Sequence, residues 1–474
     1  MYTSLFRSKA FIRFFSSGLQ ALALQVLGSI FFYIISVYLS KDSFGAISWM
    51  NALSIFVTTI LGFGLEQVVI RRIAASQRSD WAAAAFLFHS LVTFFVTLGV
   101  LLLLSLILRD NIYQALPWFF IAQGLLFLGI PLKQFLNAKE KFTPYGIIAV
   151  ISNSLRVCGA FYLITIHQLQ VRSVVMVMIG TAGAELLALL IYVITKTDFS
   201  FKFQFRAYKK LLKEATAQYV SVIFDMSLSR MDWLLLGFMA SKTVLADYSF
   251  AYRAYELSRL PMLIIAPVIL PRLSRLMALK PSNQLQEQVN SFNTVELLLA
   301  MLLPLVLNIL WTPVVGMITG GKYGAANATE FLILSLCIPL QFFINLLWSL
   351  SFSAKKYKAV SSVTVICATT NIALNLILIP LLDGIGSAVA FLITNILQAV
   401  LYYRLVNKNI MHISLRPFVI LFPAALAGWF ITASININFL FRLLLGIVFY
   451  LLIALISKQL SSRNIQNSKQ FLAQ

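Results

Sequence analysis

The chain has 474 residues, of which 60% are hydrophobic and 11% are charged, and its mean hydropathy is +0.88. These values exclude a soluble globular protein and predict an integral membrane protein. The net charge of +21 would also suit a nucleic-acid-binding protein, so the positions of the basic residues have to decide between the two. Cys158, Cys337 and Cys367 lie in apolar segments without metal-ligand spacing, so neither a disulfide framework nor a metal site is expected.

Apolar segments long enough to cross a bilayer follow one another along the whole chain. A helix needs about 20 apolar residues to span a hydrocarbon core of about 30 Å. We therefore predict about fourteen transmembrane helices, at approximately residues 15–39, 44–69, 82–107, 114–135, 143–166, 173–195, 215–240, 244–270, 289–311, 326–350, 359–380, 385–405, 416–434 and 438–457. The first segment is too long for a cleaved signal peptide and has no clear cleavage site, so it is interpreted as an uncleaved span.

The basic residues are distributed unevenly between the two sides of the predicted membrane. With the N-terminus placed in the cytoplasm, roughly 27 of the 37 Lys and Arg residues fall in cytoplasmic segments and about six fall outside. The positive-inside rule accounts for this bias and places both termini in the cytoplasm. The net charge then reflects topology and attraction to anionic membrane lipids, and no nucleic-acid partner is expected. The longest polar segment, residues 196–213, interleaves aromatic and basic side chains and suits the inner membrane interface.

A weak internal repeat at an offset of about 201 residues indicates how the spans are grouped. Ser40-Lys41 after the first span corresponds to Ser241-Lys242 after the seventh. Because six spans separate equivalent positions, the two halves share one orientation, as in parallel transporter repeats. The predicted fold is an all-α integral membrane protein with two parallel six-helix bundles, at residues 1–206 and 207–410, followed by two additional transmembrane helices and a cytoplasmic tail at residues 411–474.

Ten of the charged residues inside the predicted spans stand out. A charge that faces lipid costs roughly 2.5–3.5 kcal/mol, so all ten would cost on the order of 30 kcal/mol. That exceeds the typical stability of a fold, about 5–15 kcal/mol, so most of these residues must pair, reach a helix end or line a water-filled cavity. The set consists of Arg156, Arg230, Arg253 and Arg259 together with Glu66, Glu185, Asp225, Asp232, Glu256 and Glu296.

Guanidinium groups within a membrane protein indicate a cavity that binds an anion. The four arginines are therefore the predicted substrate-binding residues. The predicted cavity acids or coupling groups are Glu185, Asp225, Asp232 and Glu256. No catalytic residue and no cofactor is predicted, because the near-match to a phosphate-binding loop at residues 316–322 is followed by Tyr323 where Ser or Thr would hold magnesium.

Structural alternatives stay open for the same residues. Arg156 can form a buried pair with Glu185 or with Glu66, and a salt-bridge network between the seventh and eighth spans can hold the bundle together. A network that exchanges partners between two states can also serve a transport cycle. For Glu66 and Glu296, near the inner ends of their spans, a structural role is favoured.

Several short motifs are similar to those of a known family. They are Phe44-Gly45, Gly62-Phe63-Gly64-Leu65, Arg71-Arg72-Ile73-Ala74, Met231-Asp232-Trp233-Leu234-Leu235-Leu236-Gly237, Pro271-Arg272-Leu273-Ser274, Gly320-Gly321-Lys322-Tyr323, Asn371, Asn375, Pro380 and Gly384-Ile385-Gly386-Ser387-Ala388. With these motifs, residues 1 to about 410 resemble the polysaccharide flippases, the Wzx-like branch of the multidrug/oligosaccharidyl-lipid/polysaccharide exporter superfamily. Ala246 and Ser387 depart from the family's usual residues, and the last two spans match in hydropathy alone.

The resemblance implies two lobes, alternating access, and export of undecaprenyl-pyrophosphate-linked oligosaccharide repeat units across a bacterial inner membrane for O-antigen or capsule-type polysaccharide. It also implies membrane lipids, a polysaccharide polymerase and a chain-length regulator as partners, and we expect a monomer. A lipid II flippase, a multidrug antiporter and a membrane polysaccharide polymerase are the alternatives. The antiporter is disfavoured by the basic residues and the polymerase by the absence of a large outer loop. The motifs leave the sugar composition and the coupling ion open.

Overall fold

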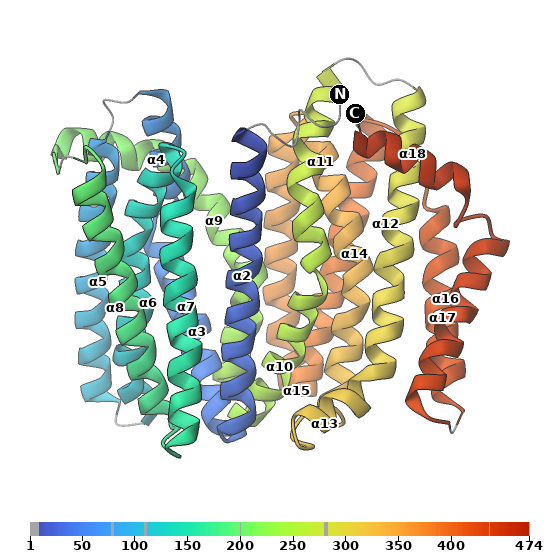
Figure 1. Ribbon diagram of the computed structural model, residues 1–474, viewed down its shortest axis with the longest axis horizontal. Coiled ribbons are helices and arrows are strands. Elements are labelled where there is room, and N and C mark those ends of the chain that lie inside the picture. The colour runs from blue at the N-terminus through green and yellow to red at the C-terminus, as the bar shows by residue number, and fades with distance from the viewer. Residues whose placement is uncertain are drawn as a thin grey trace. The chain divides into compact units, whose positions relative to one another are not determined.

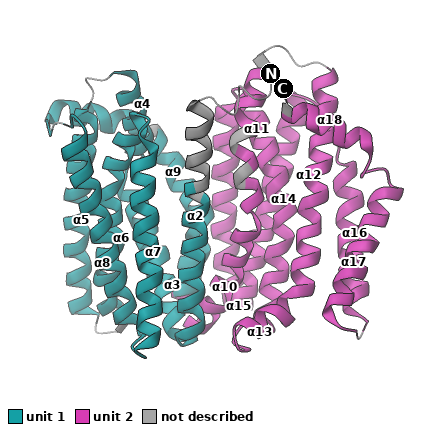
Figure 2. Ribbon diagram, viewed as in Figure 1, with its two compact units in different colours: residues 1–237 teal, residues 238–474 magenta. Residues whose placement is uncertain are grey.

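The computed structural model describes residues 9–76, 80–108, 111–199, 201–278, 283–435 and 437–473, and throughout these ranges the chain forms helices joined by loops, without a strand. The predicted all-α class is therefore confirmed. The chain divides after Gly237 into two compact units (Figure 2). Unit 1 comprises residues 1–237 and unit 2 comprises residues 238–474.

Unit 1 is a bundle of long helices joined by short loops (Figure 1). Its helices are α2 (Lys9–Tyr38), α3 (Lys41–Leu61), α4 (Leu65–Ala75), α5 (Trp81–Ile107), α6 (Asn111–Ala138), α7 (Phe142–Thr165), α8 (Val171–Lys196) and all but the end of α9 (Phe205–Met239). Helix α6 is central, because it packs against α3, α4, α5 and α8. Helix α7 joins α2 to α8.

Unit 2 has a comparable set of helices and a surface helix at its C-terminal end. Its elements are α10 (Lys242–Ser258), α11 (Leu260–Ala278), α12 (Asn283–Leu310), the π-helix η1 (Trp311–Val315), α13 (Gly316–Ile318), α14 (Ala328–Ser353), α15 (Tyr357–Asn409), α16 (Arg416–Ala433), α17 (Phe439–Ile456) and α18 (Ser462–Ala473). Helix α14 packs against α10, α11, α12 and α15, and α12 also contacts α16, α17 and α18.

Ten helices within the described residues are long and apolar enough to cross a membrane. They include the 53-residue helix α15, which contains two of the predicted spans. Helices α9, α10 and α11 are not among the ten, although α9 and α10 carry five of the ten charged residues discussed above. The prediction of a multi-pass membrane protein is confirmed, while the count of about fourteen spans stays a prediction.

The two serines aligned by the sequence repeat have the same structural role in their units. Ser40 caps the N-terminus of α3, where its hydroxyl accepts a hydrogen bond from the Ser43 backbone N–H at 3.2 Å. Ser241 caps α10 in the same way and accepts from the Val244 backbone N–H at 3.3 Å. A serine N-cap satisfies one of the free N–H groups of the first turn, which explains this match between the two halves.

Two breaks in the helices occur at residues with positive φ. Phe63 (φ 50°) and Gly64 (φ 65°) separate α3 from α4. A Cβ on Gly64 would lie 2.9 Å from the Tyr219 backbone nitrogen of α9, so this position requires glycine for both its conformation and its close contact. The second break is at Asp383 (φ 50°, ψ −129°), between the two predicted spans that α15 contains.

Candidate functional site

The charged residues inside unit 1 gather on α4, α6, α7 and α8. Glu185 of α8 is 3% exposed and accepts a hydrogen bond from the Lys133 ammonium of α6 at 2.7 Å. The next residue of α6 contacts a second acid: the Gln134 amide donates to the Glu66 carboxylate of α4 at 2.7 Å. Lys133 is close enough to Glu66 to attract it electrostatically. The Lys133 ammonium thus pairs with Glu185 and attracts Glu66, and these two carboxylates belong to different helices.

Arg156 of α7 is half-buried beside this group. Its Nε donates to the Thr181 hydroxyl of α8 at 3.3 Å, and the Ser152 hydroxyl donates to the Thr181 backbone carbonyl at 3.0 Å. The Arg156 charge also attracts Glu185, although the hydrogen-bonded partner of Glu185 is Lys133. The guanidinium therefore keeps donors that are not committed to a carboxylate hydrogen bond, as an anion-binding group requires.

Three of the predicted charges lie on α9 in different surroundings. Asp225 is exposed, whereas Asp232 is 1% exposed and accepts a hydrogen bond from the Trp233 backbone N–H at 2.9 Å. Arg230 lies over the Trp233 ring, with 5.3 Å between the guanidinium carbon and the ring centroid. The seven-residue spacing of the two aspartates places them on one helix face, yet only the second is enclosed by neighbouring side chains.

The predicted residues of unit 2 lie on α10 and at its C-terminal end. The Arg253 guanidinium donates to Glu256 at 2.9 Å, and both side chains are largely buried. Arg259 follows α10 and lies over the Tyr255 ring, at 4.6 Å from its centroid. It also donates to the Gln341 carbonyl of α14 at 3.3 Å. Arg253 therefore has an acidic partner, while the two contacts of Arg259 are to neutral groups.

Buried amides and hydroxyls link the two halves of α15. Asn375 donates to the Asn371 side chain at 3.2 Å and accepts from the Ser387 hydroxyl at 2.7 Å. Asn371 donates in turn to the Thr394 hydroxyl at 3.3 Å. These bonds join residues before Asp383 to residues after it. Asn371 and Asn375 therefore have a structural role, because they hold the two halves of α15 together.

Glu296 of α12 differs from the other acidic residues. It is 4% exposed, and neither of its carboxyl oxygens has a hydrogen-bond partner among the described residues. It lies one helical turn after Asn293, whose amide donates to the Ser414 backbone carbonyl at 3.4 Å. A structural role for Glu296 stays a prediction.

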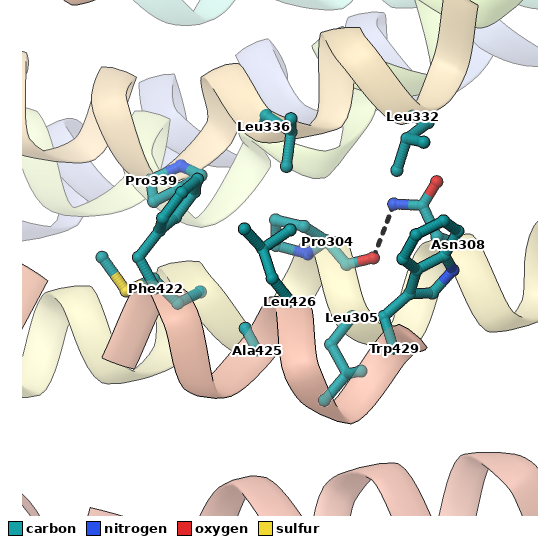
Figure 3. Close-up of a pocket in the computed structure, with 11 residues that line it drawn as sticks. Pro304, Leu305, Asn308, Leu332, Leu336, Pro339, Phe422, Ala425, Leu426 and Trp429 are labelled. Carbon is teal, nitrogen blue, oxygen red and sulfur yellow. Dashed lines mark hydrogen bonds between the residues drawn. The ribbon is translucent and has the colours of Figure 1, made fainter. Parts of the chain in front are cut away.

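An apolar cavity of about 340 Å³ lies between α14, α15 and α16 of unit 2, with Phe343, Ile396, Tyr403 and Phe418 in its wall. Leu336 of α14 and Phe422 of α16 also line a smaller pocket between α12, α14 and α16 (Figure 3).

The smaller pocket has one amide in its wall, that of Asn308 (Figure 3). This amide donates to the Pro304 carbonyl and to the Ser335 hydroxyl, each at 2.7 Å. With its donor satisfied, the amide leaves the pocket suited to hydrocarbon. Among the described residues, no group of three or more His, Cys, Asp or Glu is placed to hold a metal ion.

Comparison with known proteins gives the family. A family model described as "Polysaccharide biosynthesis protein" matches residues 11–277, which is more than half of the chain. The chain belongs to the polysaccharide biosynthesis protein family. No curated protein sequence matches it significantly. The resemblance to Wzx-like exporters inferred from the motifs is therefore confirmed at the level of the family.

Solved structures show which fold this family member adopts. Lipid II flippase MurJ, in an inward closed conformation, is 16% identical, with a TM-score of 0.76 over 93% of this chain and 98% of that one. An inward-facing multidrug resistance MATE transporter of the MOP superfamily is 14% identical, with a TM-score of 0.65 over 81% of this chain and 95% of the other. A MOP superfamily transporter from Pyrococcus furiosus is 12% identical, with a TM-score of 0.56 over 83% and 96%.

These neighbours are described as flippases and transporters, and this chain shares their fold. They also confirm the exporter-like fold class. The residues that sequence reasoning missed are Lys133 and Gln134. Both lie near the end of the predicted fourth span, at 114–135, and neither was named as a candidate. In the structure both are part of α6, and Lys133 holds Glu185.

Proposed function

We propose that this protein translocates undecaprenyl-pyrophosphate-linked oligosaccharide repeat units from the cytoplasmic to the outer leaflet of a bacterial inner membrane, for O-antigen or capsule-type polysaccharide. Membership of a polysaccharide biosynthesis family and the exporter fold support a lipid-linked sugar as cargo. The observation that carries the proposal is the half-buried Arg156 of α7, whose Nε donates to the Thr181 hydroxyl of α8.

The chemistry of the cargo matches the residues available. A pyrophosphate presents paired oxygens to the planar fork of a guanidinium, which stays charged at every physiological pH. Arg156, Arg230, Arg253 and Arg259 are the proposed phosphate-binding residues. Glu185, Asp225, Asp232 and Glu256 are the proposed balancing or coupling acids. Their role is to keep binding weak enough for release, because a transported group must also leave its site.

The polyprenyl chain of the cargo requires an apolar surface beside the pyrophosphate path. The cavity between α14, α15 and α16 has such a surface and a volume of about 340 Å³. We propose that it accepts part of the polyprenyl chain. Alternating access, a monomeric protein, and a polymerase with a chain-length regulator as downstream partners complete the proposal.

Lipid II is the second candidate cargo, because a lipid II flippase matches this fold over 93% of the chain. It shares the polyprenyl pyrophosphate with the first candidate and differs in its sugar and peptide. Purified protein offered both lipids in one vesicle preparation distinguishes them: the preferred cargo reaches the opposite leaflet faster.

Deletion of the gene in its host, followed by leaflet-resolved measurement of lipid-linked oligosaccharide, tests the proposal. We expect complete repeat units to accumulate on the cytoplasmic side and wild-type protein to restore export. Arg156→Ala should fail to restore it, Arg156→Lys should restore it in part, and Arg172→Ala, an exposed arginine of the same unit, should restore it fully. Accumulation of single repeat units on the outer side would instead mean that polymerisation fails, and would refute the proposal.

A further inference from the structure

The first turns of α9 separate basic from apolar side chains by face. Arg206, Lys209, Lys210 and Lys213 are all exposed and follow the spacing i, i+3, i+4 and i+7 that lines one side of a helix. On the opposite side, Leu211 and Ala215 are fully buried in the core of unit 1, with Tyr208 and Leu212 packed beside them. The helix is thus fixed to unit 1 by one face and presents four cations on the other.

The carboxylate on this part of α9 is held mainly by α4, although Lys210 also attracts it. Glu214 accepts two hydrogen bonds from the Arg72 guanidinium of α4, one of them from Nε at 3.0 Å. It also lies 3.9 Å from Arg71. Among the described residues, none of the four cations on the exposed face of α9 forms an ion pair with a carboxylate. The face defined by Arg206, Lys209, Lys210 and Lys213, called the basic face below, therefore keeps a net positive charge.

The length of α9 places this face at the depth of lipid headgroups. A helix of 35 residues is about 52 Å long, whereas the hydrocarbon core is about 30 Å thick. The predicted seventh span, residues 215–240, leaves the first turns of α9 outside the core, and this polar end lies beside α4 (Figure 1). The aromatic rings of Phe201 and Phe205, 58% and 61% exposed, flank the basic face, as is typical of segments that lie in the membrane interface.

We propose that the basic face of α9 is a docking surface for anionic phospholipid headgroups, such as those of phosphatidylglycerol. Four exposed cations match a negatively charged leaflet, and the exposed rings insert among the acyl chains beneath them. An acidic protein would match the charge equally well, but it would not provide the apolar environment that the exposed rings of Phe201 and Phe205 require. The lipid would hold the start of α9 at a fixed depth while the remainder of the transporter moves. This proposal is independent of the cargo.

Electron paramagnetic resonance of spin-labelled lipids tests it with the full-length protein in phosphatidylcholine vesicles. The ratio of association constants for labelled phosphatidylglycerol and labelled phosphatidylcholine measures the preference for the anion. One cation near an anionic surface is worth a factor of about five, so R206Q/K209Q/K210Q/K213Q should remove a preference of up to several hundredfold at these sites. The preference in wild type should also fall at 1 M salt, where the Debye length is about 3 Å.

The matched control removes the same number of exposed cations from unit 2, as K355Q/K356Q/K358Q/K408Q, and should keep most of the preference. An equal loss in both quadruple variants would overturn the proposal, because net charge alone would explain it. Unchanged preference in the α9 variant would also overturn it, and loss of an acidic co-purifying protein in that case would identify a protein partner instead. If the quadruple variant does not fold, R206Q/K209Q and K210Q/K213Q should each lose about half of the effect.

Discussion

The ion pair between Lys133 and Glu185 gives the sharpest prediction about stability. The two atoms are 2.7 Å apart, and the side chains are 24% and 3% exposed. Removing one partner of a buried pair costs about 3–5 kcal/mol, because the other charge is left without compensation. The two single variants should differ. Lys133→Met leaves an anion that is almost fully buried, whereas Glu185→Gln leaves a cation that still reaches the surface.

We expect Lys133→Met to lower the free energy of unfolding by about 3 kcal/mol, the lower end of that range. In this variant the charge of Arg156, which attracts Glu185, still compensates part of the Glu185 charge. Glu185→Gln should cost about 1–2 kcal/mol, since the ammonium that remains can keep water and the nearby Glu66 as partners. The double variant K133M/E185Q should cost less than the sum of the two, with a coupling energy of about 1–3 kcal/mol.

Reversible unfolding in mixed micelles, followed by intrinsic fluorescence, measures these differences. The pair between Arg463 and Glu287 serves as a control, because it has the same 2.7 Å separation but side chains that are 78% and 48% exposed. Arg463→Gln should cost no more than about 1 kcal/mol. An equal loss of unfolding free energy in Lys133→Met and Arg463→Gln would refute the view that burial strengthens the pair between Lys133 and Glu185. Additive effects of K133M and E185Q would refute it as well.

Three further predictions concern backbone strain and pH. Gly64→Ala should cost about 2 kcal/mol or more, since its φ is 65° and the new Cβ would lie 2.9 Å from a backbone nitrogen of α9; Gly99→Ala, at a position with open space, should be neutral or stabilising in the same thermal scan. Asp383→Gly should raise the unfolding free energy by about 1 kcal/mol, because φ 50° and ψ −129° are strained for aspartate, and a lower stability would contradict this. The hydrogen bond from Arg72 lowers the pKa of Glu214 below 4.5. Its contribution is therefore complete above that pH and is lost as the pH falls through the lower folded-state pKa, so wild type and Glu214→Gln should converge in acid and differ at pH 7.

Hydropathy and charge distribution predicted the helical membrane fold, because an apolar segment of 20 residues has few other stable states. The repeat identified Ser40 and Ser241, and the structure explains the match as two N-caps. The predicted spans 359–380 and 385–405 placed a boundary around Asp383, but the positive φ of that residue could not be predicted from the sequence.

Pairing among the charges could not be predicted, because it depends on rotation and depth of helices that are distant in sequence. Lys133 lies 52 residues from Glu185 and near the end of its span, where lysine is ordinary. Arg156 was identified as a candidate from the sequence, but its hydrogen-bond partner, Thr181 of α8, carries no charge to reveal it. Whether the four arginines bind phosphate stays a prediction.

The central claim is that this protein moves a lipid-linked oligosaccharide between leaflets, and reconstitution tests it most directly. Vesicles that contain undecaprenyl-pyrophosphate oligosaccharide in both leaflets are exposed to a membrane-impermeant glycosidase. With the wild-type protein, we predict that the enzyme digests all of the oligosaccharide, whereas with Arg156→Ala it digests only the outer-leaflet share. Digestion limited to the outer leaflet in the presence of folded wild-type protein would contradict the claim.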